Sequence, residues 1–245
     1  MSTVNDDSPT TPAPGSGPAA DRSHSGSDSG SVRDWLRGIE VFARPLPGFA
    51  TDRVPAEPTE LFLDWLAGAV EAGVPDPHAM TLSTVDESGD PDARVLILKD
   101  VGPEGFRFAA HAASPKGVQL AATPRAALTF YWAELGRQVR VRGAVRTEPA
   151  ERSAADFLAR GATARAEALL GRQSRYLTDP AARDRALRDG LARIEAEPGL
   201  VGPAWTLRTV VPDVVEFWQA DAARAHTRLR YEREGAAWQR HRLWP

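Results

Sequence analysis

The chain has 245 residues, of which 42% are hydrophobic and 26% charged, and a formal net charge of −3. This composition indicates a soluble protein with one hydrophobic core, and its charge would not attract nucleic acid or an anionic membrane. There is no cysteine, which excludes disulfides, and the five histidines lack metal-ligand spacing, so we expect no metal site. Because no apolar run reaches membrane-spanning length and no signal peptide is evident, we expect a cytoplasmic protein.

Residues 1–31 are mostly Ser, Gly, Pro, Asp, Thr and Ala, a composition that predicts a disordered tail. We expect residues 32–245 to form a single domain, because no internal repeat or second linker interrupts them. An apolar stripe of Leu61, Trp65 and Ala69 at helical spacing predicts a helix that begins after Glu57 and ends near Gly73.

The pattern then changes to strands. Strands are predicted at 79–85, 94–99, 126–132, 138–147, 205–211, 214–219, 228–233 and 238–243, and helices at 149–160, 164–170 and 180–196. The apolar run at 126–132 predicts a strand that is covered on both faces, whereas 138–147 alternates as a half-buried strand does. Many short antiparallel strands with a few helices predict the α+β class and a closed or nearly closed sheet.

The segment from Ala93 to Gly117 contains the only two lysines of the chain, Lys99 and Lys116. Every other basic side chain, histidine apart, is arginine, and the two residue types are not interchangeable at a binding site. The segment predicts two strands followed by a helix that begins at Pro115 with Ser114 as its N-cap. The two lysines are therefore candidate functional residues, and the alternative is that they are surface residues without a role.

Several motifs occur in order along the chain. They are Arg94-Val-Leu-Ile-Leu-Lys99, Ser114-Pro-Lys116-Gly117, Arg137-Gln138-Val139, Gln173-Ser174, Glu216-Phe-Trp218-Gln219, Arg224-Ala-His226-Thr-Arg228 and the final Arg-Leu-Trp-Pro. Together they resemble the pyridoxamine 5′-phosphate oxidase family of FMN-binding split β-barrels, over residues 57 to 245. No GxGxxG or Walker loop is present, so a Rossmann nucleotide site is not supported.

The resemblance implies a mostly antiparallel split β-barrel with flanking helices, a homodimer, and FMN bound between subunits, with residues from about 204 to 245 serving dimerisation and the substrate. It implies that the FMN-binding residues are Arg94, Val95, Leu96, Ile97, Leu98, Lys99, Lys116, Gln138, Gln173, Ser174, Trp218 and Arg228. It also implies that Arg224 and His226 are catalytic, and that these two residues and Lys99 bind the substrate. If this segment is extended, Arg224, His226 and Arg228 point to the same side and form a row. Arg, Lys and hydroxyl donors suit the dianionic phosphate of FMN.

The sequence departs from the family at two places. Pro115 stands where the family has an arginine that binds the FMN phosphate, and Asp156, Ala162 and Ala164 match the positions that hold the substrate's phosphate. Lys99 is then the only phosphate ligand retained, although Arg160 and Arg165 flank the gap. This pattern resembles the specialised-metabolism branch of the family, such as the flavin oxidases of phenazine biosynthesis.

We therefore predict an FMN-dependent oxidase that transfers a hydride from a small aromatic or heterocyclic substrate to FMN, which O₂ reoxidises. One alternative is a true pyridoxine/pyridoxamine 5′-phosphate oxidase with a rearranged phosphate site. Another, of a different class, is a flavin-binding protein without turnover, although the presence of Arg224 and His226 argues against it.

Overall fold

The computed structural model describes residues 31–42 and 44–245. It divides the chain into two units, Met1–Val41 and Phe42–Pro245. The described part of the first unit contains helix α1 (Val32–Arg37), where the Oγ atom of Ser31 accepts a hydrogen bond from the backbone N–H of Asp34 at 3.2 Å. The predicted disordered tail lies outside the described residues, except for Ser31. The single domain over 32–245 stays a prediction.

The second unit contains helices and strands in the predicted classes. The helices are α2 (Pro58–Glu71), α3 (Pro115–Ala122), α4 (Ala150–Leu158), α5 (Ala162–Leu169) and α6 (Pro180–Ala196), with a short 3₁₀ turn at Ala133–Leu135. The strands are β1 (Ala79–Val85), β2 (Pro91–Ile97), β3 (Asp100–Gly102), β4 (Gly105–His111), β5 (Arg125–Trp132), β6 (Arg137–Thr147), β7 (Trp205–Gln219), β8 (Thr227–Glu234) and β9 (Ala237–Leu243). Within the described residues, no helix is long and apolar enough to cross a membrane.

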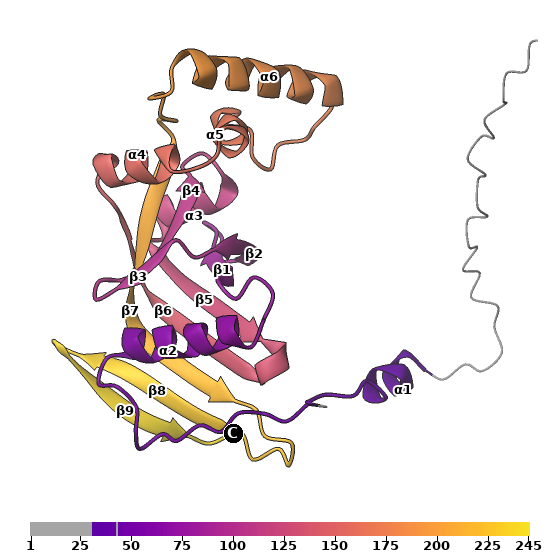
Figure 1. The fold of residues 1–245 in the computed structure, drawn as a ribbon, viewed down its shortest axis with the longest axis vertical. Coiled ribbons are helices and arrows are strands. Elements are labelled where there is room, and N and C mark those ends of the chain that lie inside the picture. Colours follow the sequence, from indigo (N-terminus) through magenta and orange to yellow (C-terminus); the bar gives the residue numbers. More distant parts are fainter. Residues whose placement is uncertain (1–30, 43) are drawn as a thin grey trace, which may run out of the picture. The chain divides into compact units, whose positions relative to one another are not determined.

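The strands form one antiparallel sheet in the order β2-β1-β5-β6-β7-β4-β3, and the β8–β9 hairpin extends it from β7 (Figure 1). Strands β2 and β3 lie at opposite edges of this order, yet only Leu98 and Lys99 separate them in the chain. Because two linking residues span only about 10 Å, the sheet must curl until its edges meet. The predicted α+β split barrel is therefore confirmed, and Lys99 lies at its seam.

The core fills the inside of the curled sheet. Inward-facing side chains from successive strands are fully buried, among them Leu82, Phe106, Phe130 and Phe217, and helix α2 covers them with Phe62 and Trp65. The strand predicted to be covered on both faces is covered on one: Tyr131 is 56% exposed, whereas its neighbours Phe130 and Trp132 are buried. The apolar run is therefore an alternating strand with a large aromatic residue on its outer face.

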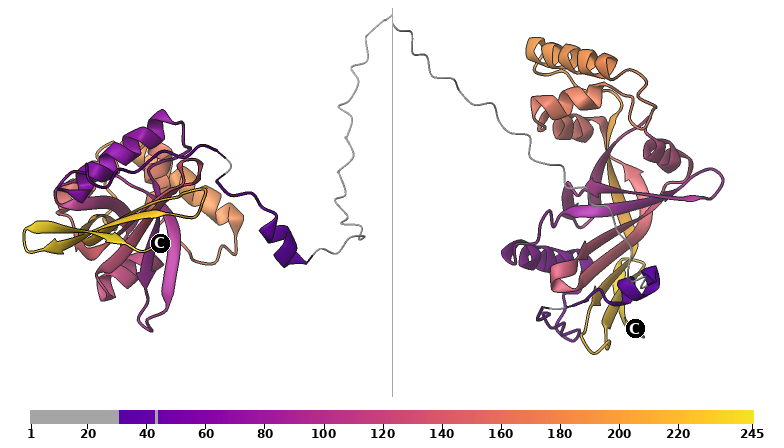
Figure 2. Two further views of the ribbon diagram at one scale, coloured as in Figure 1. Left: turned by 90° about the horizontal axis from the view of Figure 1, so that it is seen from below. Right: turned by 90° about the vertical axis from the view of Figure 1, so that its right-hand side faces the viewer.

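Strand β7 corrects the prediction of separate strands at 205–211 and 214–219. It continues through Pro212 because the register shifts there: Arg142 pairs with Val214 and Gly143 with Pro212, so Asp213 of β7 is the extra residue of a β-bulge. Gly143 permits this close approach, since a Cβ atom there would lie 1.9 Å from the carbonyl oxygen of Val211. The uninterrupted strand spans the length of the sheet (Figure 2). One of its ends lies near helices α4, α5 and α6, and the other lies near β8 and β9.

Candidate cofactor and substrate site

The N-terminal turn of α3 packs tightly on the end of β4. Ser114 is its N-cap, as predicted, and accepts a hydrogen bond from the backbone N–H of Gly117 at 3.3 Å. A Cβ atom at Gly117 would lie 2.4 Å from the carbonyl oxygens of His111 and Ala112, so only glycine fits there. This close contact fixes the backbone of the adjacent Lys116.

Lys116 is a buried cation without an acidic partner. Its side chain is 5% exposed, and its Nζ atom donates to Oε1 of Gln173 at 2.9 Å. No carboxylate lies within 4.0 Å of Nζ among the residues that the structure describes. Burial, together with the charge of Arg94, lowers the pKa of Lys116 below its usual value. A buried charge is costly unless it is paired, so this environment suits a bound anion.

Arg94 is held beside this site by a closed hydrogen-bond network. Its guanidinium donates to Oγ1 of Thr84 at 2.6 Å and to Oε1 of Gln119 at 3.2 Å, and it also pairs with Asp92. Gln119 in turn donates to Asp92 at 3.1 Å and accepts from Thr84 at 2.6 Å. Strands β1 and β2 and helix α3 therefore fix one arginine rotamer near Lys116.

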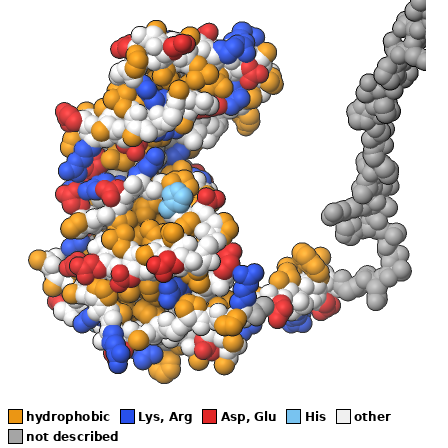
Figure 3. All heavy atoms as spheres, viewed as in Figure 1, with side chains coloured by type: hydrophobic (Ala, Val, Ile, Leu, Met, Phe, Trp, Pro, Cys, Tyr) orange, Lys and Arg blue, Asp and Glu red, His pale blue; other side chains and the backbone are white. Residues whose placement is uncertain are grey.

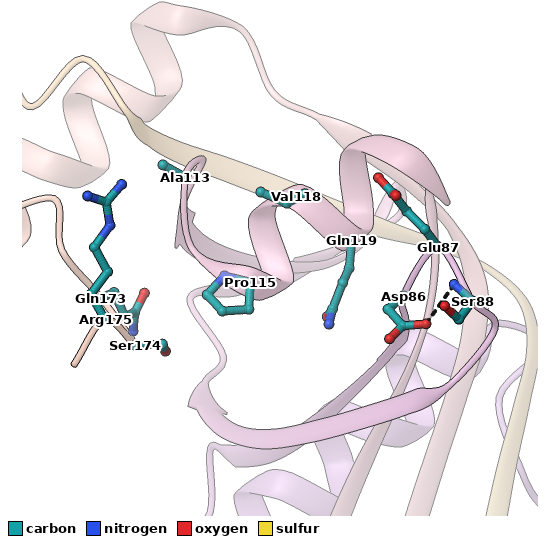
Figure 4. A pocket seen from close by; sticks show the side chains of 10 residues that line it. All are labelled: Asp86, Glu87, Ser88, Ala113, Pro115, Val118, Gln119, Gln173, Ser174 and Arg175. Carbon is teal, nitrogen blue, oxygen red and sulfur yellow. Dashed lines mark hydrogen bonds between the residues drawn. The ribbon is translucent and has the colours of Figure 1, made fainter.

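Two cavities adjoin these cations. A cavity of about 530 Å³ lies between the β1–β2 turn, α3 and the segment that carries Gln173 and Ser174, whose side chains face the start of α3 (Figure 4). A second, of about 720 Å³, reaches from Lys116 to Arg160 and Trp205 beneath α5 and α6, where the surface is indented (Figure 3). Ser174 has a φ of 65°, in the left-handed region, a conformation that is uncommon for serine.

A second group of predicted residues lies on the outer face of the sheet. Gln138, Trp218 and Arg228 are direct cross-strand neighbours on β6, β7 and β8. Residues paired in this way point to the same face, opposite the buried Val139, Phe217 and Leu229. The three predicted FMN ligands therefore form one row of partly exposed polar and aromatic side chains.

The predicted ligands on β2 are divided between the two faces. Val95 and Ile97 are exposed on the outer face, whereas Arg94 and Leu96 point inward. Leu98 is buried in the core, and its backbone N–H donates to the carbonyl of His78 at 2.9 Å. Neither the side chain nor the backbone N–H of Leu98 is thus available to a ligand.

Arg224 and His226 do not lie in an extended segment, so the expected row of Arg224, His226 and Arg228 is wrong. Arg224 has a φ of 68° and ends a turn whose backbone N–H groups bond to the carboxylate of Asp221. His226 accepts a hydrogen bond at Nδ1 from the backbone N–H of Asp221 at 3.0 Å. This bond leaves Nε2 as the protonated nitrogen of a neutral imidazole. The ring packs on Trp218, with centroids 4.9 Å apart.

Around the predicted substrate-phosphate position, Lys99 and Arg160 both lie near Asp156. The Nζ atom of Lys99 is 3.6 Å from the carboxylate of Asp156, which accepts a hydrogen bond from the indole of Trp205 at 2.7 Å. The guanidinium of Arg160 stacks 4.1 Å above the same indole ring, and its Nη1 atom is buried without a hydrogen-bond partner among the described residues. Of the two arginines that flank the gap in the sequence, Arg160 thus lies close to this position, and the retention of Lys99 as the family's phosphate ligand stays a prediction.

Arg165, the other arginine considered there, cannot serve this position. It is buried, and its Nη2 atom donates to the carbonyl oxygens of Pro198 and Leu200 at 2.7 and 2.8 Å. These bonds tie α5 to the segment after α6. Arg165 therefore has a structural role, and of the two arginines Arg160 is the one that lines the larger cavity.

The residues present fit an FMN molecule in their chemistry. Lys116, Arg94, Gln173 and Ser174 supply cationic, amide and hydroxyl groups for one phosphate, and Lys116 is a buried cation with no acidic partner within residues 31–42 and 44–245. Gln138 and Trp218 supply an amide and an aromatic surface for a ring system. Each of the two cavities is lined by at least two of the residues proposed for the phosphate. Neither cavity is lined by Gln138, Trp218 or Arg228.

Sequence reasoning missed several residues that the structure brings to these sites. Gln119 and Asp92 support Arg94, Trp205 supports Asp156 and Arg160, and Glu216 binds Arg228. Glu216 belongs to the motif Glu216-Phe-Trp218-Gln219, so its place in that motif could have identified it as a candidate. Contacts such as that between residues 156 and 205 span long stretches of sequence and leave no local pattern.

Comparison with known families gives two matches in this chain. The family model described as pyridoxamine 5′-phosphate oxidase matches residues 66–200. A second model, described as the pyridoxine 5′-phosphate oxidase C-terminal dimerisation region, matches residues 205–245. The two matches together cover the sheet and the helices α3 to α6.

Relatives of known name are similar over most of the chain. The pyridoxine/pyridoxamine 5′-phosphate oxidase of Thermosynechococcus vestitus is 44% identical over 77% of this chain and 89% of its own length. The protein of the same name from Ectopseudomonas mendocina is 41% identical over 81% of this chain and 93% of its own length.

Solved structures share the fold. The crystal structure of PhzG from Burkholderia lata, in complex with tetrahydrophenazine-1-carboxylic acid, is 30% identical, has a TM-score of 0.74, and covers 82% of this chain and 99% of its own. A pyridoxamine 5′-phosphate oxidase-related, FMN-binding protein from Nostoc punctiforme has a TM-score of 0.60 at 18% identity, over 77% of this chain and 98% of its own, which supports the fold alone.

Proposed function

Because this chain belongs to the pyridoxamine 5′-phosphate oxidase family of FMN-dependent oxidoreductases, we propose that it oxidises pyridoxine 5′-phosphate and pyridoxamine 5′-phosphate to pyridoxal 5′-phosphate. The relatives that bear this activity in their names support this substrate class over the specialised-metabolite substrate expected from the sequence. In this reaction O₂ is reduced to H₂O₂, and the amine substrate also releases ammonia after hydrolysis of its imine.

The observation that carries the proposal is that two cations, Lys99 and Arg160, lie near the same carboxylate, Asp156, and that Arg160 lines the larger cavity. Arg160 has a buried Nη1 atom without a hydrogen-bond partner in the described part of the chain, and Lys99 pairs with the nearby Asp156. A phosphate dianion would accept hydrogen bonds from both, each worth about 1.5–3 kcal/mol. The stacking of Arg160 on Trp205 orients the guanidinium before a ligand arrives.

We further propose that FMN binds between two subunits of a homodimer. Its phosphate would contact Arg94, Lys116, Gln173 and Ser174 of one subunit, and its ring would contact Gln138, Trp218 and Arg228 of the other. Two observations support this arrangement. Arg94 points to the inner face of the sheet whereas Gln138, Trp218 and Arg228 point to the outer face, and Val95, Ile97 and Tyr131 leave an apolar outer face exposed. The match to a dimerisation region agrees with it.

Bound FMN supplies the two-electron acceptor for the oxidation and is reoxidised by O₂. The chain's own residues orient the substrate. His226, packed on Trp218, presents an Nε2–H donor beside the proposed flavin wall. Arg224 contributes a cation from the adjoining turn, and together they would hold the substrate's ring while Lys99 and Arg160 hold its phosphate.

A second candidate substrate is a reduced phenazine carboxylic acid. The structural relative solved with tetrahydrophenazine-1-carboxylic acid favours it, and so does Asp156, whose charge opposes a phosphate dianion. A carboxylate carries one negative charge and would be opposed less. A flavin-binding protein without turnover is the third candidate.

The experiment compares the three candidates in one assay. FMN-loaded protein is mixed with pyridoxine 5′-phosphate, pyridoxamine 5′-phosphate, unphosphorylated pyridoxine or tetrahydrophenazine-1-carboxylic acid, and peroxide and pyridoxal 5′-phosphate are measured. Our proposal predicts turnover of both phosphates and a kcat/KM for pyridoxine at least about 100-fold lower, because two charged hydrogen bonds are lost. Faster turnover of the phenazine acid, or no peroxide with any substrate, would overturn it.

The cofactor and the dimer are tested separately. Mass spectrometry of the released flavin should give FMN, and light scattering should give twice the mass of the 26.5 kDa chain. A monomer that retains a full complement of FMN would contradict the shared site.

A further inference from the structure

Glu216 is buried on the outer face of the sheet, where it has no assigned role. Its neighbours on β7, Val215 and Phe217, point into the core, so Glu216 points to the face that carries Trp218. It is nevertheless only 3% exposed. Three arginine side chains from the adjacent strands cover it, namely Arg140, Arg228 and Arg230.

The two oxygens of the carboxylate are divided among these arginines. Oε1 bonds to Arg228 alone, accepting from Nε at 3.1 Å and from Nη2 at 2.8 Å. Oε2 accepts from Arg140 at 2.9 Å and from Arg230 at 3.1 and 3.3 Å. Arg140 and Arg230 are the direct cross-strand partners of Glu216, whereas Arg228 reaches it diagonally from the row of Trp218.

These bonds fix the plane of the Arg228 guanidinium. A guanidinium has five N–H donors, of which Nε and one on Nη2 bond to Glu216, and one on Nη1 bonds to the carbonyl oxygen of Trp244 at 2.9 Å. One donor on each terminal nitrogen therefore remains for a ligand. Although burial opposes its ionisation, the hydrogen bonds of Arg228 and the charge of Arg140 hold the pKa of Glu216 below its usual value.

We infer that Glu216 is a positioning residue, whose carboxylate orients Arg228 so that its remaining N–H donors face the flavin beside Gln138 and Trp218. The inference rests on the proposed function, in which Arg228 contacts FMN. Glu216 is not needed to keep Arg228 charged, because an arginine remains a cation without a carboxylate beside it. The role of Glu216 is therefore to fix the orientation of Arg228. The hydrogen bonds from Nε and Nη2 of Arg228 to Oε1 restrict the rotamers of the arginine side chain before the cofactor binds.

The test measures the dissociation constant of FMN by the quenching of flavin fluorescence as apoprotein is titrated. Glu216→Gln should weaken FMN binding by roughly 10- to 100-fold, the effect of losing a charged hydrogen bond. Arg230→Met is the matched control, because it removes an ion pair to the other oxygen of Glu216 and leaves the bond to Arg228. It should change the dissociation constant by less than about 3-fold.

A double-variant cycle tests whether Glu216 acts through Arg228. In an Arg228→Met background, Glu216→Gln should weaken FMN binding no further. Full additivity, or an unchanged dissociation constant in the single Glu216→Gln variant, would overturn the inference. Thermal melts followed by circular dichroism show which variants are folded. If Glu216→Gln does not fold, Glu216→Asp replaces it, because aspartate keeps the charge but is shorter.

The inference and the proposed function fail differently. If the wild-type chain does not bind FMN, or if Arg228→Met leaves FMN binding unchanged, the proposed role of Arg228 is wrong, and the inference falls with it. If Arg228→Met weakens binding but Glu216→Gln does not, the inference alone is wrong.

Discussion

The Nζ atom of Lys99 lies 3.6 Å from the carboxylate of Asp156, at the seam where the two edges of the curled sheet meet. The aspartate is held in place, because its other oxygen accepts a hydrogen bond from Trp205 at 2.7 Å. A phosphorylated substrate that binds Lys99 and Arg160 must therefore tolerate a fixed negative charge near both. Repulsion from Asp156 and attraction to the two cations together set the affinity for phosphate.

Replacing Asp156 with asparagine should improve the use of phosphorylated substrate. The amide oxygen still accepts the bond from Trp205, but the negative charge beside Lys99 is removed. We expect the KM for pyridoxine 5′-phosphate to fall by roughly 3- to 10-fold, the effect of about one unit charge in a partly exposed site. Steady-state peroxide assays measure it, with Asp213→Asn, an exposed acid paired with Arg125, as control. An unchanged or higher KM would contradict a repulsive role for Asp156.

Replacing Arg160 with methionine should have the opposite effect. Methionine retains an apolar contact with Trp205 but offers no donor to a phosphate. The KM for pyridoxine 5′-phosphate should rise by roughly 10- to 100-fold, while kcat changes little, because the phosphate is remote from the reacting atoms. Arg188→Met, at an exposed position of α6, is the control. Equal KM values for the two variants would show that Arg160 does not bind the substrate.

The buried Lys116 should make FMN binding weaken with rising pH. Burial lowers the pKa of its ammonium below the usual value of 10.5, so the charge is lost at a lower pH than for an exposed lysine. The dissociation constant of FMN should therefore rise between neutral pH and pH 10, whereas Lys116→Met should bind weakly with a flatter profile. Fluorescence titrations at several pH values test this, and parallel profiles would contradict it.

The lowered pKa of Lys116 should also make the apoprotein more stable as the pH rises, although FMN binding weakens. Between the lowered pKa in the folded chain and the ordinary value in the unfolded chain, the unfolded chain binds more protons. The contribution of Lys116 to the free energy of unfolding therefore rises with pH in that window. Urea unfolding of wild type and Lys116→Met at pH 8 and pH 10 isolates this contribution, and a fall with pH would contradict it.

Gly143 should be required for the continuity of β7. A Cβ atom there would lie 1.9 Å from the carbonyl oxygen of Val211 and 2.8 Å from Cα of Pro212, so the backbones must separate. We expect Gly143→Ala to destabilise the fold by about 2–4 kcal/mol, which lowers the melting temperature by roughly 5–15 °C. Ala144→Ser, at the next and exposed position, is the control, and equal melting temperatures would contradict the close approach.

The sequence by itself determined the class of the fold and the identity of most secondary structure elements. Alternation in residues 138–147 predicted the buried Val139, Val141 and Val145, and Ser114 predicted the start of α3. These signals are local, because the periodicity of side chains follows directly from the geometry of a strand or a helix. The ordered motifs likewise indicated the family, since they record residue types at fixed spacing.

Only the tertiary structure decided which side chains meet. The bulge at Asp213 lets two predicted strands continue as β7, and the turn at Asp221 removes Arg224 from the row expected with Arg228. Arg160 meets Trp205, and Glu216 binds Arg228, through contacts between strands and helices that are distant in the chain. Such contacts depend on sheet register, curl and rotamer together, and the pattern of a single segment carries no information about its neighbours in space.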